Sequence, residues 1–191
     1  MTLQEKQLLK KTDNVSIRID SELSSKLHEK CLEQKISLNT LINHLLDKQV
    51  NWHELTTEMG WIPMFRSTFR EISDSIPKDK IEKIAETTGS SDLKNSLNYV
   101  YGYVELDSVL DLFKKRCASM NVQYREIEVN GKNKIIIQHD LGKNWPIFII
   151  GQMNTILNEI GHRIINEEYN KQGFSFEIVK TEDIELSKNH A

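Results

Sequence analysis

Apolar and polar residues alternate along the stretch Asn14–Asp20. The apolar positions are Val15, Ile17 and Ile19, and the polar positions are Asn14, Ser16 and Arg18. This period of two predicts a half-buried β-strand with one apolar and one polar face. A lone strand leaves its backbone groups unpaired along both edges, so it needs a partner strand. No second strand pattern lies near it in the sequence.

Two amphipathic helical patterns follow this strand. The first begins with Ser21 as its capping residue and repeats Leu23, Leu27 and Cys31 every four residues. The second begins at the cap Ser37 and runs toward Val50. Its apolar stripe comprises Leu38, Leu41, Ile42, Leu45 and Leu46. So small a domain exposes too much apolar surface to be stable alone. Antiparallel pairing of two copies of the strand would supply both the partner strand and the missing core.

The run Val15–Leu23, then Leu27 and Ile36–Ile42, closely resembles the ribbon-helix-helix DNA-binding domains of the MetJ/Arc/CopG type. In that family, two strands from a dimer form a ribbon that enters the DNA major groove. The resemblance covers residues 13–50. It implies that Asn14, Ser16 and Arg18 read bases, and the chemistry of these side chains suits that role, since Arg can pair with guanine and Asn with adenine.

The start of the second helix predicts a phosphate contact. Ser37, Leu38 and Asn39 lie where free backbone N–H groups and the positive end of the helix dipole favour an anion. Lys10 and Lys11 precede the strand and are further candidates for phosphate contacts, although such a basic run is more often a solvated tail. The competing interpretation is that Asn14, Ser16 and Arg18 form the solvated face of a strand in some other mixed domain.

Beyond Val50 the pattern changes to that of an α+β domain. Gly60–Pro63 interrupts the helical periodicity, and helices are then expected from Met64 to Ile72, from Ile76 to a stop at Gly89, and from Ser90 or Ser91 toward Met120 with a break near Gly102. Asn130-Gly131 predicts a hairpin turn between strands at 122–129 and 134–139. A long helix is predicted over 145–170 and a last strand over 174–179. This order favours a small antiparallel sheet covered by one long helix.

These patterns divide the chain into five parts. We expect a flexible arm at 1–12, the ribbon-helix-helix domain at 13–50, a linker at 51–62, an α+β oligomerisation or sensor domain at 63–180 and a polar tail at 181–191. The second half contains Gly60–Pro63, then a helical pattern that ends near Ile84–Gly89, and later the run His139–Trp145. On these segments it is similar, more weakly, to regulators predicted in archaea that fuse a ribbon-helix-helix domain to a larger domain. That similarity supplies no ligand or catalytic residue.

Charge and cysteine content narrow the class of protein. Residues 1–50 hold eight Lys or Arg and seven Asp or Glu, a balance of +1 in a chain whose net charge is −3. Binding should therefore be modest for each dimer, and a second dimer on the same operator is one way to strengthen it. Cys31 and Cys117 lack metal-type spacing, which favours a reducing compartment. With no membrane span and no signal peptide expected, the sequence predicts a soluble cytoplasmic protein.

One corner of the second domain has candidate ligand-binding chemistry. His139 and Asp140 meet the start of the helix at 145, where they could bind an anion or, together with His162, a metal. The simpler interpretation is a loop hydrogen bond by His139, a turn capped by Asp140 and a surface His162. We assign no metal ligands and expect no cofactor. The sequence has no phosphate loop, nucleophile elbow or zinc-protease motif, so we predict that the protein is not an enzyme.

The sequence thus predicts a homodimer or dimer of dimers that binds double-stranded DNA and regulates transcription. The alternative is an antitoxin, in which the same DNA-binding dimer regulates its own operon while the C-terminal part neutralises a toxin. A third class is an interaction scaffold that does not bind DNA. A compact C-terminal domain favours the first interpretation, because antitoxin tails are commonly disordered when free.

Overall fold

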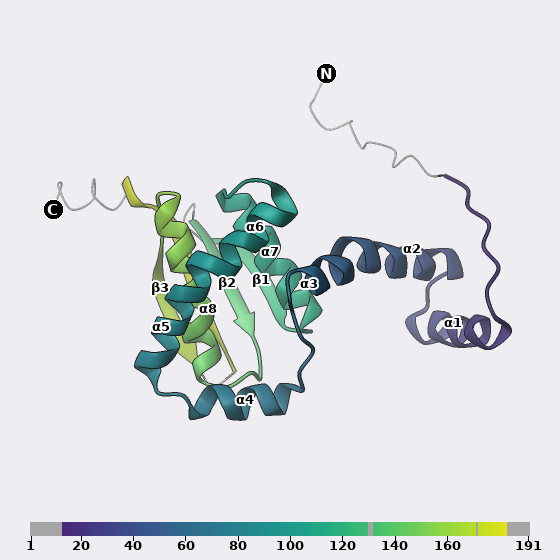
Figure 1. Ribbon diagram of the computed structural model, residues 1–191, viewed down its shortest axis with the longest axis horizontal. Helices are drawn as coiled ribbons and strands as arrows, with labels where there is room; N and C mark the ends of the chain where they lie inside the picture. Colours follow the sequence, from purple (N-terminus) through teal and green to yellow (C-terminus); the bar gives the residue numbers. More distant parts are fainter. Residues whose placement is uncertain (1–12, 130–131, 171, 183–191) are drawn as a thin grey trace, which may run out of the picture. The chain divides into compact units, whose positions relative to one another are not determined.

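The computed structural model describes residues 13–129, 132–170 and 172–182, and it divides the chain into two compact units, Met1–His53 and Glu54–Ala191. Each unit has its own secondary structure and is described by itself (Figure 1). The division falls within the predicted linker at 51–62. Among the described residues, no helix combines the length and the apolar composition that crossing a membrane requires.

The first unit contains two helices joined by a tight turn. They are α1 (Ser21–Gln34) and α2 (Leu38–Lys48), and the π-helical turn η1 (Gln49–His53) extends α2. The cap of α1 is Asp20 and not the predicted Ser21, because the Asp20 carboxylate accepts the N–H of Glu22 at 2.8 Å. α1 ends at Lys35, which has a left-handed backbone with φ 55°.

The core of the first unit is small. Its central cluster consists of the buried Leu27, Cys31 and Leu41, and the partly buried Ile19, Ile36 and Leu38 pack against them. These residues come from the stripes that the sequence predicted for the two helices. Trp52, in η1, is also buried. A core of this size leaves several large apolar side chains of the unit exposed, among them Leu23, Leu45 and Leu46.

Residues 13–20 have neither helix nor strand structure. A strand exists only when its backbone groups bond to a neighbouring strand, and the described residues of this single chain offer none near Asn14–Asp20. The prediction of a ribbon formed with a second copy therefore stays a prediction.

The second unit is an α+β structure, as predicted. Its helical segments are α3 (Glu54–Glu58), α4 (Arg66–Ser75), α5 (Lys78–Thr88), η2 (Gly89–Leu93), α6 (Lys94–Tyr101), α7 (Leu106–Ser119) and α8 (Asn144–Glu159). Its strands are β1 (Gln123–Val129), β2 (Lys132–Gln138), β3 (His162–Asn170) and β4 (Gly173–Lys180). The strands form one antiparallel sheet in the order β1-β2-β4-β3. The predicted hairpin turn Asn130-Gly131, between β1 and β2, lies outside the described residues.

Helices pack on one face of this sheet (Figure 1). Strand register brings Ile135 opposite Phe176 and Ile137 opposite Phe174, and all four side chains are buried. α8 contributes a further buried row consisting of Trp145, Ile149, Met153 and Ile156. The core of the unit therefore lies between α8 and the alternating apolar positions of β2 and β4, which confirms the predicted sheet with its covering helix.

The helix predicted over 145–170 is too long, because α8 ends at Glu159. Gly161 has φ +73°, a left-handed conformation that ends the helix, and β3 begins at His162. Ile164 and Ile165 continued the helical period by coincidence. In the structure, Ile164 is buried on the core face of β3, where it pairs with β4.

Gly89 does not stop a helix, contrary to the sequence prediction. The helical path continues from α5 through η2 into α6 and ends at Gly102, which has φ +75°. A Cβ atom on Gly89 would lie 2.9 Å from the carbonyl oxygen of Gln152 on α8, and one on Gly151 would lie 2.7 Å from the Cβ of Ala85. The two glycines are therefore needed where the α5–η2 segment crosses α8 at close range.

Candidate nucleic-acid interface

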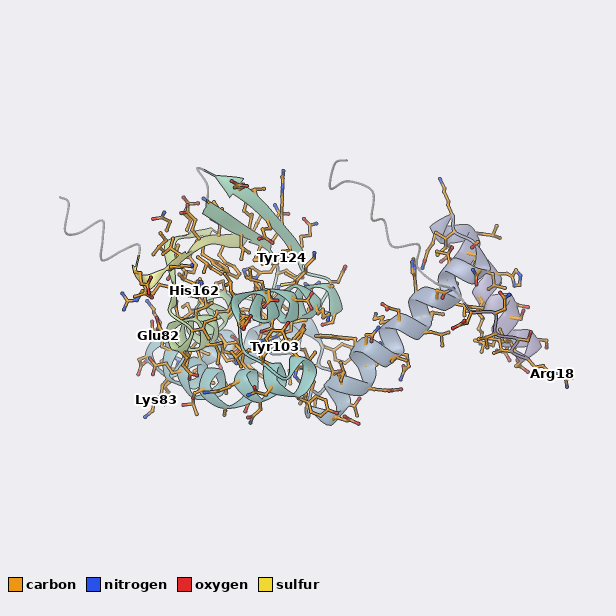
Figure 2. The ribbon with its side chains drawn as sticks, turned by 90° about the horizontal axis from the view of Figure 1, so that it is seen from above. Arg18, Glu82, Lys83, Tyr103, Tyr124 and His162 are labelled. Atoms are coloured by element: carbon orange, nitrogen blue, oxygen red, sulfur yellow. The ribbon has the colours of Figure 1, made fainter. Side chains whose placement is uncertain are left out.

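The three predicted base-reading residues lie on one exposed segment. Asn14, Ser16 and Arg18 are exposed, and Figure 2 shows the Arg18 side chain extending away from the ribbon. The intervening Val15 and Ile17 are also exposed, at 79% and 59%. Two of the three apolar side chains of the alternating pattern therefore lack a covering surface in the single chain, whereas Ile19 packs against the core.

The residues predicted to hold a phosphate lie at the start of α2. Ser37 caps the helix, and its Oγ accepts the N–H of Thr40 at 3.1 Å. Leu38 packs against the core, so its side chain does not face solvent, but its backbone N–H is one of those that a helix leaves unpaired at its first turn. Asn39 is exposed and its Oδ1 accepts from Asn43 at 3.2 Å. Lys10 and Lys11 lie outside the described residues.

Further apolar side chains of the first unit are exposed on its two helices. They are Leu23, Leu32, Leu45, Leu46 and Val50. Monomeric soluble proteins seldom expose so many large apolar side chains in so small a unit. Together with Val15 and Ile17, these side chains leave an apolar surface of the first unit uncovered in the single chain.

The His139 corner follows the simpler of the two interpretations in part. The Nδ1 atom of His139 accepts the N–H of Leu141 at 3.2 Å, so it makes the expected loop hydrogen bond. Burial against the neighbouring aromatic rings lowers the pKa of His139, which keeps the imidazole neutral near pH 7. Asp140 does not cap the turn, and instead forms an ion pair with Arg66 at 2.5 Å.

His139 and His162 are far apart. Gln138, which precedes His139, is opposite Gly173 at the start of β4, whereas His162 is opposite Lys180 at its end. Seven residues of strand separate the two positions, roughly 23 Å at about 3.3 Å per residue. The Nδ1 atom of His162 donates to the carbonyl oxygen of Ile160 at 2.9 Å. Nowhere in the described ranges do three His, Cys, Asp or Glu side chains gather as a metal would require.

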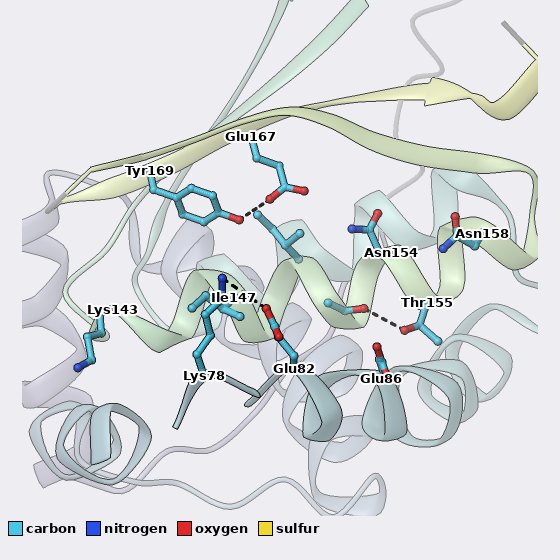
Figure 3. A pocket seen from close by; sticks show the side chains of 12 residues that line it. Lys78, Glu82, Glu86, Lys143, Ile147, Asn154, Thr155, Asn158, Glu167 and Tyr169 are labelled. Atoms are coloured by element: carbon cyan, nitrogen blue, oxygen red, sulfur yellow. Dashed lines mark hydrogen bonds and ion pairs between the residues drawn. The ribbon is translucent and has the colours of Figure 1, made fainter. Parts of the chain in front are cut away.

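A groove that sequence reasoning missed lies between α5, α8 and β3 (Figure 3). Its volume is about 650 Å³. Glu82 and Glu86 line one side, Glu167 and Tyr169 line the other, and Lys78 lies 3.6 Å from Glu82. Tyr169 donates to Glu167 at 2.5 Å, and burial and this carboxylate raise the pKa of the phenol.

The α5 side of this groove was readable from the spacing of Lys78, Glu82 and Glu86, which recur every four residues. Glu167 and Tyr169 were not, because the sequence placed them on a helix. A bulge between Ile165 and Glu168 in β3, with Asn166 at φ 52°, sets where these side chains point. The carboxylates of Glu82 and Glu86 therefore lie across the groove from that of Glu167.

The second unit contains one cysteine, Cys117, whose surroundings do not activate its thiol as a nucleophile. Cys117 is buried, and burial raises the pKa of its thiol to about 12. It is therefore a thiol near pH 7 and not a reactive thiolate. Its neighbour Arg116 stacks on the Trp61 ring, with 5.2 Å between the guanidinium carbon and the ring centre.

Comparison with known proteins gives no match: no family model fits the chain, and neither a curated protein nor a solved structure is significantly similar to it. The resemblance to ribbon-helix-helix domains therefore rests on the residues of the first unit and on their exposure in the structure.

Proposed function

We propose that this protein is a sequence-specific DNA-binding transcription regulator that acts as a homodimer. In the dimer, residues 14–19 of two copies pair as an antiparallel ribbon, and Asn14, Ser16 and Arg18 face the major groove. The observation that carries the proposal is the exposure of Val15 and Ile17 on a segment that alternates with polar side chains. Pairing would bury these two side chains against the helices of both copies.

The helices of the first unit support this arrangement. α1 and α2 present exposed Leu23, Leu45 and Leu46 around a central cluster of only three buried side chains. At about 25 cal/mol per Å² of apolar surface removed from water, burial of such side chains in a dimer contributes about 1.5–3 kcal/mol for each fully covered one. The first turn of α2, capped by Ser37, then offers backbone N–H groups to a phosphate on each side of the ribbon.

The second unit has a compact core of its own, which supports a regulator over an antitoxin with a disordered tail. We assign to it the pairing of protomers or the sensing of an effector. The antitoxin remains the second candidate, since an autoregulating antitoxin would use the same DNA-binding dimer.

Selection of genomic DNA fragments by the full-length protein tests this function. We expect enrichment of sites with two related half-sites, and an affinity for duplex DNA that decreases as salt is raised. A scrambled duplex of the same length and composition is the control. Binding that fails to distinguish the enriched site from the scrambled duplex would exclude a sequence-specific regulator and leave the scaffold class.

A further inference from the structure

A second groove, here called the corner groove, lies where β2 leads into α8. It is lined by Arg70, His139, Asp140, Lys143, Pro146 and Tyr169, together with neighbouring residues, and its volume is about 650 Å³. Small-molecule sites typically occupy about 300–1,000 Å³. Lys143 and Tyr169 also border the groove of Figure 3, where Lys143 points away from Glu82. The corner groove thus adjoins the groove of Figure 3, and its size suits an organic ligand.

The loop that forms this groove is held firmly in place. The buried side chain of Asn144 donates to the carbonyl oxygens of Ser73 and Ile76, at 2.8 Å each. The Asp74 carboxylate accepts the N–H of Asn144 at 3.1 Å, and Gly142 has φ +92° beside it. A Cβ atom on Gly142 would lie 2.6 Å from Asp74 Oδ1, so a glycine is required here. The loop is therefore preorganised, which lowers the entropic cost of binding a ligand.

Cations exceed carboxylates around the corner groove. The Asp140 carboxylate is paired with Arg66 at 2.5 Å, and Asp74 accepts a backbone N–H behind the loop. Arg70 makes only a long hydrogen bond of 3.4 Å, to the carbonyl of Asp140. In the described part of the chain, no carboxylate pairs with Arg70 or Lys143. Two cationic side chains at this groove are thus free to meet an anion.

The wall behind these cations is aromatic. His139 lies 4.7 Å from the Trp145 ring and 5.7 Å from the Phe174 ring, and Tyr169 stacks on Phe174 at 6.5 Å with 19° between the ring planes. Since Nδ1 of His139 accepts a hydrogen bond, the proton of the neutral ring is on Nε2. This atom is buried and has no acceptor among the described residues. A buried donor of this kind is normally satisfied by a water or a ligand.

We propose that the corner groove binds an organic carboxylate with a flat apolar body. The carboxylate would meet Arg70 and Lys143, and the apolar body would lie against Pro146 and the exposed side of Tyr169. Arg offers a carboxylate two parallel hydrogen bonds, and Lys adds a point charge. A free phosphate fits less well, because it would leave the apolar wall uncovered. The regulatory use of this site rests on the proposed function, whereas its ability to bind does not.

Titration of the full-length protein with benzoate and indole-3-acetate tests the site, with benzamide and inorganic phosphate as comparisons. We expect saturable heats for the two carboxylates by calorimetry, at least ~10-fold weaker binding of benzamide, and a shift of the His139 ring resonances by NMR. The variant Arg70→Gln/Lys143→Gln should weaken benzoate binding by at least ~10-fold. Both side chains are exposed, so this variant should keep the thermal unfolding midpoint.

The matched control is Lys78→Gln, which removes a cation from the neighbouring groove and should leave benzoate affinity unchanged. Equal binding of benzoate and benzamide, no saturable binding of either carboxylate at about 10 mM, or an unaffected double variant would each overturn the proposal. DNA affinity measured with and without benzoate separates the two claims. If benzoate binds but does not change the DNA affinity, the site is kept and its regulatory role is removed. If the protein binds no DNA either with or without benzoate, only the proposed function is refuted.

Discussion

Arg18 combines the features that a base-reading side chain needs. It is exposed, it lies between Ile17 and Ile19, and its guanidinium can donate two parallel hydrogen bonds to one guanine. A short neighbour such as Ser16 reaches fewer base edges, so a large share of the selectivity should depend on Arg18.

Replacement of Arg18 by Ala should leave the dimer intact, because the side chain does not face the apolar side of the segment. The variant should lose about 1–3 kcal/mol of discrimination at one base pair in each half-site. Titration of the enriched duplex and of single-base variants measures this loss. Arg18→Lys is the control that keeps the charge while losing the paired hydrogen bonds, and selectivity that survives in both variants would show that this face does not read DNA.

At the scale of elements, the segment 14–19 and the two helices of the first unit depend on each other. The segment has no partner strand in the single chain, and the helices bury only Leu27, Cys31 and Leu41. Dimerisation would give the segment a partner strand and would enlarge the core between the helices. A change on the apolar side of the segment should therefore affect assembly, and a change on the polar side should not.

Replacement of Ile17 by Lys tests this dependence. The charge would lie beneath the ribbon without a partner, and an unpaired buried charge is costly enough to prevent a small dimer from forming. We expect DNA binding to fail. With spin labels attached to the segment 14–19, the distance between the labels of two copies should lengthen, or no distance should be detectable. Ser16→Lys, on the opposite side, should preserve the distance; a short distance retained in Ile17→Lys would refute strand pairing.

The close packing of α5–η2 on α8 predicts how a substitution at Gly89 changes the stability of the second unit. Gly89→Ala would place a Cβ 2.9 Å from the Gln152 carbonyl oxygen. Alanine favours a helix over glycine by about 0.5–1 kcal/mol, but overpacking against a backbone atom costs about 1–3 kcal/mol. We expect a net loss of stability in urea unfolding. Ser90→Ala, at an exposed neighbour, should change stability by less than about 0.5 kcal/mol, and a stabilised Gly89→Ala would show that the helices separate easily.

At the scale of the whole molecule, the question is what the second unit adds to DNA binding. The first unit is nearly neutral, with a balance of +1 over residues 1–50, so the proposed DNA-binding dimer would contact few phosphates. The second unit has a core and two grooves of its own, which is more than a linker or a cap requires. We infer that it pairs protomers and sets the spacing of half-sites.

Comparison of residues 1–55 with the full chain on one operator tests that role. The full chain should give a longer footprint, a higher stoichiometry by sedimentation and a tighter complex, because a second interface raises the effective concentration of the second DNA-binding unit. Circular dichroism must first show that the fragment is helical. The same footprint, stoichiometry and affinity for both proteins would indicate a partner-binding role for the second unit.

The sequence alone determined the elements whose signals are local. The cap Ser37, the apolar stripes that place Leu27, Cys31 and Leu41 inward, and the strands β1, β2 and β4 follow from periodicity and capping, which depend on neighbouring residues. The nearby Asp20 replaced Ser21 as the cap because either side chain can accept the helix N–H groups, and only the backbone path selects between them.

Tertiary structure decided the features that depend on contacts between distant residues. Residues 162–170 became a strand because β4 offers hydrogen bonds along its free edge, although their apolar residues also fit a helix. The helical path continues through Gly89, where the absence of a side chain allows α8 to pack at close range. The corner groove brings Arg70 together with His139 and Lys143, which lie far from it in sequence. Such encounters leave no periodic signal along the chain, because they are set by how whole elements pack.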